Sequence, residues 1–392
     1  MNFKLITPTA VLLLLLSVAL SAGTPFTRGA QDFEKTFTET FDVDGSGEVR
    51  LTNRYGAIRV ETWERNEVKI DVRVTVSADN QEQADRTFNR IEISFSGGGN
   101  SASAITSIGT GSRKSKGIIA SLMNGEWPSW SGGNSSNDFK VHYLVKMPAS
   151  AGLETDAKYC DVNLPDLSGN TRLTVGYGNL VAGDLTGRGE VAVSYGSARI
   201  DQLGPNSTFR VRYCDGNEIR KAADLRYDGR YSETEIGTVG RLIVDAGYEE
   251  LEVDEAREIR FDGNYNDLTV DRVERLFFDG NYSDLVVHDL LKELEVDASY
   301  GDVEIEDVSS EFERIYIRTN YIDVELDVDD DAGFDFELRT RYGDISFDPG
   351  GALGSDIRKE KSGSSSSVIG KRAGKGRGSI DVSTSYGDID ID

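Results

Sequence analysis

The sequence predicts an all-β protein, a parallel β-helix-like solenoid of ~17–21-residue coils behind an N-terminal β-rich cap with one short helix. Two observations support this prediction: a tyrosine recurs at a nearly constant interval, and apolar residues alternate around each copy. The interval is 17 to 21 residues from Tyr159 to Tyr342, followed by one interval of 44 residues. The repeated tyrosines are Tyr159, Tyr177, Tyr195, Tyr213, Tyr231, Tyr248, Tyr265, Tyr282, Tyr300, Tyr321, Tyr342 and Tyr386.

The residues around each tyrosine indicate two strands per coil. In the coil of Tyr300, Val296 and Ala298 precede the tyrosine, and Val303 and Ile305 follow it. Period-two alternation is typical of strands with one buried face. The parity changes after the tyrosine, so the following Gly-Asp or Asn-Asp pair predicts a corner, with glycine supplying the backbone freedom and Asx stabilising the turn. Each coil is therefore strand, corner, strand and loop, and successive coils stack in register.

A single coil of this kind is not stable alone. It buries about six apolar side chains at roughly 2 kcal/mol each, whereas ordering its residues costs about 1.5 kcal/mol apiece. Neighbouring coils must therefore cover its upper and lower faces. We expect a right-handed path, because parallel crossovers are overwhelmingly right-handed.

Residues 1–22 predict a secretory signal peptide. Lys4 precedes the apolar run from Val11 to Leu16, and small residues follow that run. A retained membrane anchor is the alternative, but the apolar run is short for a bilayer span. We expect an exported mature protein without a transmembrane span, located in the periplasm, at the cell surface or in the medium.

The charge and the cysteines restrict the partners. A formal charge of −25 argues against nucleic acid, whose phosphates this chain would repel. We therefore expect a monomer that binds an extracellular or envelope ligand, a glycan or a protein. Cys160 and Cys214 each follow a repeated tyrosine and lie three coils apart, or about 14 Å, which exceeds the ~7 Å that a disulfide allows. Free thiols are predicted.

Residues 23–150 are expected to form the N-terminal capping region. LTNRYGAIRVETW (51–63) is an early copy of the repeat, with Tyr55 in register, and residues 68–76 alternate as a strand. Asp79 and Glu82 predict the cap of a short helix with Ala84, Phe88 and Ile91 on its buried side. A further strand is expected at 139–147.

Residues 97–138 are Gly/Ser-rich and predict a long loop. The loop contains Arg113, Lys114 and Lys116, and then Trp127 and Trp130. One interpretation is a contact with a glycan or membrane. The other is that the tryptophans fix the loop to the solenoid wall.

Residues 151–392 are expected to form the solenoid, interrupted by a Ser/Gly-rich insertion at 349–379. The insertion is basic, with Arg358, Lys359, Lys361, Lys371, Arg372, Lys375 and Arg377. It either holds an anionic surface or lies against the acidic wall. The chain ends on SYGDIDID (385–392), which predicts an uncapped strand edge; Asp388, Asp390 and Asp392 would oppose end-to-end pairing there.

Two columns of acidic residues are expected to face water. One lies two residues after the tyrosine and includes Asp267, Asp284 and Asp302; the other lies three residues before it and includes Asp262, Asp279 and Asp297. Stacked carboxylates repel one another, so a compensating interaction is required. The columns either serve turn formation and solubility or bind Ca²⁺, which prefers several oxygen ligands. No other cofactor is expected.

The tyrosines are expected to form a structural ladder. Alternation places their rings inward at the corner, where rings about 4.8 Å apart stack. The alternative is an exposed aromatic ladder that binds a polysaccharide. The ladder includes Tyr177, Tyr195, Tyr265, Tyr282, Tyr300 and Tyr342.

Catalytic residues are not predicted. The chain has only His142 and His288, which leaves no histidine cluster for a metal and no Ser/His/Asp spacing. Paired carboxylates are too common in this sequence to mark an active site. We therefore expect a non-enzymatic protein.

Three stretches resemble a known family: RLTNRYGAIRVETWERNEVKIDVRV (50–74), KVHYLVKMPASAGLETDAKYCDVNL (140–164) and the recurrent S-Y-G-D-I/V pairs. They are similar to the bacterial putative-adhesin β-strand-repeat family, a domain of unknown function related in style to the autotransporter-adhesin head domain. The resemblance covers residues 40–392 and implies a β-solenoid at the cell envelope. The expected function is a surface scaffold or adhesin; the alternatives are a filament subunit and a carbohydrate-active β-helix enzyme.

Overall fold

The computed structural model describes residues 30–109, 139–347 and 357–392, and the chain divides into two compact units, 1–165 and 166–392. The predicted signal peptide and the side chains of Trp127 and Trp130 lie outside the described residues. Apart from one helix, the described elements are strands, as the sequence predicts. The elements of the first unit are β1 (Gln31–Asp42), β2 (Glu48–Trp63), β3 (Glu67–Ala78), α1 (Gln81–Phe88), β4 (Ile91–Gly97), β5 (Ser101–Ile108), β6 (Phe139–Pro148) and β7 (Gly152–Leu164).

The first unit is built around β2, which passes through a corner at Tyr55 and pairs on both sides of it. Before the corner β2 runs parallel to β5 and β7, and after it β2 runs parallel to β6 and β7. The antiparallel strands β3 and β1 extend the sheet beyond β6, and β4 extends it beyond β5. Part of the predicted 97–138 loop is therefore a strand: the Ser/Ala alternation of β5 buries Ala102 and Ala104.

Helix α1 begins one residue later than the sequence predicts. Asn80, not Asp79, is the N-cap, and its side chain accepts a hydrogen bond from the Gln83 amide. Ala84 and Phe88 are buried as predicted, whereas Ile91 already belongs to β4.

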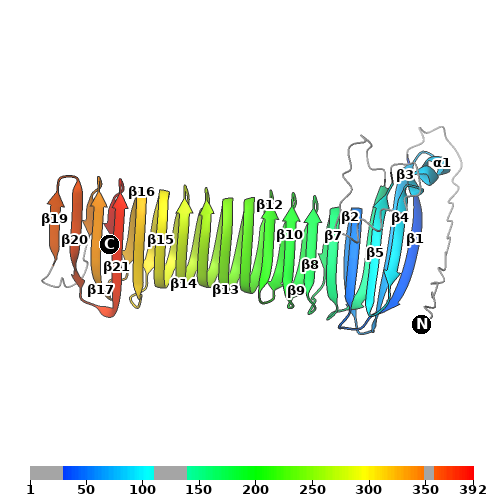
Figure 1. Ribbon diagram of the computed structural model, residues 1–392, viewed down its shortest axis with the longest axis horizontal. Coiled ribbons are helices and arrows are strands. Elements are labelled where there is room, and N and C mark those ends of the chain that lie inside the picture. The colour runs from blue at the N-terminus through cyan, green and yellow to red at the C-terminus, as the bar shows by residue number, and fades with distance from the viewer. Residues whose placement is uncertain (1–29, 110–138, 348–356) are drawn as a thin grey trace, which may run out of the picture. The chain divides into compact units, whose positions relative to one another are not determined.

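Apart from the hairpin β19–β20, the second unit consists of parallel strands stacked in register, with two strands per coil (Figure 1). Leu173, Val191, Phe209 and Tyr227 form one buried column across neighbouring strands. The strands of the second unit are β8 (Thr171–Gly176), β9 (Leu180–Leu185), β10 (Gly189–Ser194), β11 (Ala198–Leu203), β12 (Ser207–Arg212), β13 (Asn217–Asn264), β14 (Asp267–Asn281), β15 (Asp284–Val308), β16 (Arg314–Val328), β17 (Ala332–Arg341), β18 (Ile345–Phe347), β19 (Arg358–Ser362), β20 (Ser365–Arg372), β21 (Lys375–Ser385) and β22 (Ile389–Ile391).

The last coil in sequence is not the last coil in space. Strand β21 pairs in parallel with both β16 and β17, and β22 pairs with β16 and β18, so residues 375–391 lie between the two preceding coils (Figure 1). The prediction that residues 385–392 form an uncapped strand edge is therefore wrong. The interval of 44 residues between Tyr342 and Tyr386 is long because it includes strands β19 and β20, which precede β21 in the sequence.

The hairpin β19–β20 covers the end of the stack instead. Strand β20 pairs antiparallel with β17, and the turn carbonyl of Ser364 accepts the hydrogen bond of the Tyr342 amide at 2.8 Å. In other coils the corresponding acceptor is supplied by the next coil, as for Tyr195 and Arg212. The hairpin therefore satisfies the backbone edge that a further coil would otherwise cover.

Four of the basic residues of the 349–379 insertion contact the acidic wall, as the second of the two interpretations expects for them. Lys361 pairs with Asp344, Lys371 with Asp335 and Lys375 with Asp331, at 3.3, 3.0 and 2.6 Å. Arg372 is only 4% exposed, and its guanidinium donates to the carbonyl oxygens of Val328 and Asp329. The insertion thus neutralises carboxylates at the capped end.

Candidate binding face

The corner tyrosines adopt a left-handed backbone, which the sequence analysis assigned to glycine. Their φ angles lie between 54° and 66°, a region that bulky residues rarely occupy. A left-handed residue reverses the inside–outside alternation, so the tyrosine points outward and the next residue points inward. At some corners this next position has room only for glycine: a Cβ on Gly196 would meet the carbonyl oxygen of Gly178. Other corners hold a larger buried side chain there, such as Cys214 or Ile322.

The rings consequently lie on the surface, so the prediction of inward-facing tyrosines is wrong. In the second unit they are 43–51% exposed. Neighbouring rings stack with centroids 4.6–5.1 Å apart and planes within 3–10° of parallel. We call this row the tyrosine ladder: Tyr177, Tyr195, Tyr213, Tyr231, Tyr248, Tyr265, Tyr282, Tyr300, Tyr321, Tyr386 and Tyr342, in spatial order.

Stacking offsets the backbone strain of the ladder. A left-handed residue costs roughly 1–2 kcal/mol, whereas each aromatic pair contributes about 0.5–1.5 kcal/mol beyond its area burial. An interior ring makes two such pairs, so the two terms are of similar size before ring burial is counted. Because ring faces cover one another, the accessible part of each residue is its ring edge and phenol group. In the first unit Tyr55 stacks on Tyr159 at 5.0 Å in the same way.

One acidic column flanks the ladder, two residues after each tyrosine, and its side chains accept backbone hydrogen bonds from the adjacent coil. The Asp302 amide donates to Asp284 Oδ1 at 2.9 Å, and the Asp388 amide donates to Asp323 Oδ1 at 2.8 Å. Asn179, which breaks the acidic pattern, accepts from the Ser197 amide in the same geometry. Where Asp or Asn occupies the column, its oxygen satisfies a backbone amide of the adjacent coil, and this hydrogen bond offsets the repulsion between neighbouring carboxylates.

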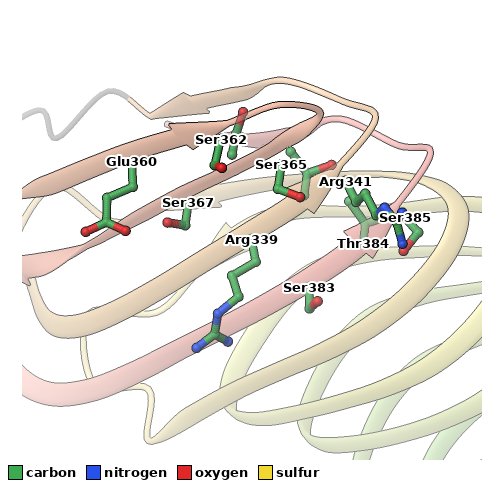
Figure 2. Close-up of a pocket in the computed structure, with 11 residues that line it drawn as sticks. Arg339, Arg341, Glu360, Ser362, Ser365, Ser367, Ser383, Thr384 and Ser385 are labelled. Carbon is green, nitrogen blue, oxygen red and sulfur yellow. The ribbon is translucent and has the colours of Figure 1, made fainter.

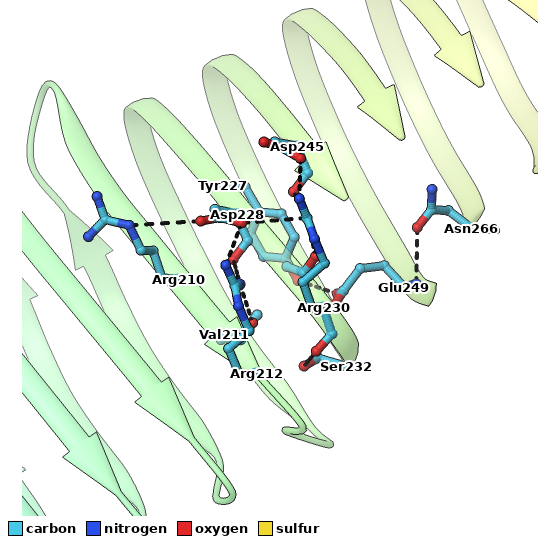
Figure 3. Close-up of polar contacts among 11 residues, drawn as sticks. Arg210, Val211, Arg212, Tyr227, Asp228, Arg230, Ser232, Asp245, Glu249 and Asn266 are labelled. Carbon is cyan, nitrogen blue, oxygen red and sulfur yellow. Dashed lines mark hydrogen bonds and ion pairs between the residues drawn. The ribbon is translucent and has the colours of Figure 1, made fainter. Parts of the chain in front are cut away.

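The second acidic column, three residues before the tyrosine, is partly neutralised by arginines. Arg212 donates to Asp228 at 2.8 Å and Arg230 to Asp245 at 2.5 Å, each also contacting the main-chain carbonyl of its aspartate (Figure 3). Further along the column, burial and the charges of Asp262 and Asp297 raise the pKa of Asp279. In the other column, burial and Asp284 raise the pKa of Asp267.

The proposed calcium ligands form two rows rather than one enclosed cluster. Asp267 pairs in register with Asp284 and Asp284 lies next to Asp302 along the corner, while Asp262, Asp279 and Asp297 occupy the neighbouring strand positions. Within residues 30–109, 139–347 and 357–392, no group of three or more His, Cys, Asp or Glu side chains is arranged to hold a metal ion.

A buried carboxyl group occupies the inside of one corner, which sequence reasoning missed. Glu249 is 3% exposed, and the Tyr227 hydroxyl donates to its Oε2 at 2.6 Å (Figure 3). Its Oε1 and the Nδ2 of buried Asn266 have no hydrogen-bond partner among the described atoms. Burial raises the pKa of Glu249 to about 7, so this side chain titrates near neutrality. The signal in the sequence was a glutamate at a position that in the other coils holds only uncharged residues.

Both cysteines are free and buried, as predicted. They occupy the inward position directly after a corner tyrosine, where other coils have Gly, Ser, Asn, Glu249 or Ile322. Burial raises the pKa of the Cys160 thiol to about 12, so the thiol is protonated and unreactive at neutral pH.

The two histidines belong to different units. His142 lies on β6 of the first unit, where burial lowers its pKa, and His288 lies on β15, 2.9 Å from Asp271. Among the helices of the described segments, none is long and apolar enough to cross a membrane.

Comparison with known proteins identifies the family. No curated protein matches the chain. One similar solved structure is a "putative lipid binding protein" from Parabacteroides distasonis, with 13% identity, 68% of this chain and 94% of that chain covered, and a TM-score of 0.32. A "putative cell adhesion protein" from Clostridium sporogenes has 9% identity, 91% and 99% coverage, and a TM-score of 0.19. A "putative adhesin" from Bacteroides fragilis has 13% identity, 68% and 94% coverage, and a TM-score of 0.22.

A family model matches residues 48–392, from the first strand that passes a tyrosine corner to the end of the chain. The chain belongs to the Toastrack DUF4097 family.

Proposed function

We propose that the protein is a non-enzymatic binding scaffold of the adhesin type, exported from the cytoplasm, and that its binding surface is the tyrosine ladder. The observation that supports this most is the exposure of 43–51% at each of these rings, held in a backbone conformation that bulky residues rarely adopt. If solubility alone shaped this surface, Asn or Gly would satisfy the left-handed corner with less strain.

The ladder is a preorganised surface. Tyrosine offers large amphipathic contact area at low entropic cost, which is why binding surfaces are rich in it. Here each ring is already fixed by its neighbours at 4.6–5.1 Å, so little side-chain freedom remains to be lost on binding.

The ligand class follows from the groups that the ladder presents. Phenol groups and ring edges repeat along the stack, and the carboxylates of the flanking column, such as Asp267 and Asp284, run beside them. Hydroxyl and carboxylate groups both hydrogen-bond to the hydroxyls of sugars. An extended polysaccharide lying along the ladder would make the same weak contact at many coils, and its affinity would increase with chain length.

The alternative functions have less support. For a filament subunit, the exposed edge at the capped end is β19, whose Arg358, Lys359, Glu360 and Lys361 oppose strand pairing. For a carbohydrate-active enzyme, carboxylates such as Asp284 and Asp323 are engaged by backbone amides of the next coil.

The proposal is tested by affinity gel electrophoresis in gels that contain soluble neutral or acidic polysaccharides. We expect retardation by at least one polysaccharide, and weaker retardation for the triple variant Tyr248→Asn, Tyr265→Asn, Tyr282→Asn. Asparagine tolerates the left-handed backbone, and a triple Tyr→Phe variant removes only the hydroxyl groups.

The matched control is Val181→Asn with Ile369→Asn, which removes exposed apolar side chains away from the ladder. Equal retardation of the triple Asn variant and the wild type, or equal affinity for short and long oligosaccharides, would refute binding along the ladder.

A further inference from the structure

A polar cavity of about 400 Å³ lies at the capped end of the second unit, between β17, β19, β20 and β21 (Figure 2). It adjoins the end of the tyrosine ladder, because Arg341 contacts Tyr342, but no ladder tyrosine is among the residues that line it. Its volume falls within the range of small-molecule sites. The residues that line the cavity are serines, two threonines, two arginines and one glutamate: Arg339, Thr340, Arg341, Glu360, Ser362, Ser365, Ser366, Ser367, Ser383, Thr384 and Ser385.

Strand register brings these side chains together in two rows. Arg339 of β17 lies opposite Ser383 of β21 on one side and Ser367 of β20 on the other. Arg341 lies in the same way between Ser385 and Ser365. Strand β19 completes the rows, with Glu360 opposite Ser367 and Ser362 opposite Ser365. Each arginine is thus bordered by serines from two different strands.

The two arginines differ in how much of their charge is already engaged. Arg339 hydrogen-bonds to Glu337 and lies 3.7 Å from Asp381. Arg341 has no carboxylate within ion-pair distance in the part of the chain that the structure describes; its guanidinium lies 5.2 Å from the Tyr342 ring centroid. Hydrogen bonds from Ser364 and Arg341 lower the pKa of Tyr342, which agrees with a positive potential at this corner. Arg341 is therefore the available cation of the cavity.

We propose that this cavity, the serine–arginine pocket, binds the uronic acid unit of an acidic glycan, with Arg341 on the carboxylate and the serines on the sugar hydroxyls. Arginine binds carboxylates through paired N–H groups, and serine both donates and accepts hydrogen bonds. Glu360 adds an acceptor for a sugar hydroxyl at the far side of the row.

Charge favours a monoanion over a dianion. The lining carries two arginines and one glutamate, but Glu337 and Asp381 offset the charge of Arg339, so the guanidinium of Arg341 is the one available to an anion. The whole chain carries −25, which disfavours a phosphate dianion more than a single carboxylate. A neutral sugar would leave Arg341 without its partner.

The test is isothermal titration of the protein with glucuronate, glucose and inorganic phosphate. We expect saturable binding of glucuronate with a Kd on the order of 1 mM, as its size allows, and at least ten-fold weaker binding of glucose and phosphate. Arg341→Gln should weaken glucuronate binding at least ten-fold. Ser365→Ala with Ser385→Ala should weaken it while retaining the guanidinium.

The charge-matched control is Arg358→Gln, on exposed β19 outside the pocket lining, which should bind as the wild type does. Absence of saturable glucuronate binding, equal binding of phosphate or glucose, or wild-type binding by Arg341→Gln would each overturn the proposal. The Tyr248→Asn, Tyr265→Asn, Tyr282→Asn variant should retain glucuronate binding, so failure of the ladder proposal and failure of the pocket proposal are distinguishable.

Discussion

Replacing one interior tyrosine of the ladder tests the balance between ring stacking and backbone strain. Tyr265 has φ 62° and stacks on Tyr248 and Tyr282 at 4.8 and 4.9 Å. Tyr265→Asn removes the ring and places there a residue that tolerates the left-handed region. The backbone can therefore stay in place, and the change in stability reports mainly on the ring.

The expected loss is about 2–3 kcal/mol. Two aromatic pairs account for about 1–3 kcal/mol. The ring is 47% exposed, and burial of the remaining apolar part, about 70 Å², contributes about 2 kcal/mol. Relief of the left-handed strain returns about 1–2 kcal/mol. For a unit of this size the net loss corresponds to a Tm decrease of roughly 5–10 °C.

Thermal unfolding followed by circular dichroism measures this change. Tyr265→Phe retains the stack and should unfold within about 0.5 kcal/mol of the wild type. Tyr342→Asn should cost less than Tyr265→Asn, because Tyr342, at the end of the described ladder, stacks on Tyr386 alone. An unchanged or higher Tm for Tyr265→Asn would refute the reasoning that stacking and burial of the ring together outweigh the strain of the left-handed backbone.

Three further predictions concern charge. The pKa of Glu249 in the folded protein is raised from 4.5 to about 7, so the native state retains a proton that the unfolded state loses. The free energy of unfolding should therefore fall by roughly 3 kcal/mol as the pH rises between these values. Denaturant titrations of Glu249→Gln should lack this decline. Asp284→Asn should keep the hydrogen bond from the Asp302 amide and match or exceed the wild-type Tm. Asp284→Ala should lose that hydrogen bond and lower the free energy of unfolding by about 1–2 kcal/mol. An alanine variant as stable as the wild type would contradict the role of Asp284 as a hydrogen-bond acceptor at the corner. Millimolar Ca²⁺ and NaCl of matched ionic strength should shift the Tm equally, and a Ca²⁺-specific increase of several degrees would instead identify the acidic columns as ion sites.

The sequence predicts the buried positions of the coils well, because alternation with period two depends only on which face meets the core. Leu173, Val191 and Ile305 are buried where the pattern places them. The direction of the tyrosines was not predictable in this way, since one left-handed residue reverses the alternation locally. The change of parity after the tyrosine was the available signal, but glycine, the usual left-handed residue, stood next to it.

The capped end was harder to predict because its contacts join residues far apart in sequence. Asp323 and Asp388 share a hydrogen bond across 65 positions, and every coil carries a similar pattern, so the sequence does not specify which coil lies beside which. The serine–arginine pocket depends on the same register, since Arg341 lies opposite Ser385 only because β21 is inserted beside β17, and opposite Ser365 because β20 folds back on β17. The burial of Glu249 likewise could not be predicted without knowing that the residue after each corner tyrosine points inward.

The outward direction of the ladder is tested most directly by nitration with tetranitromethane, followed by peptide mapping of the folded protein. The ladder tyrosines of the second unit should react, because each is 43–51% exposed, whereas buried Tyr143 and Tyr227 should remain unmodified until the protein is denatured. Protection of the ladder tyrosines in the folded protein would contradict the account, because it would place their rings in the core.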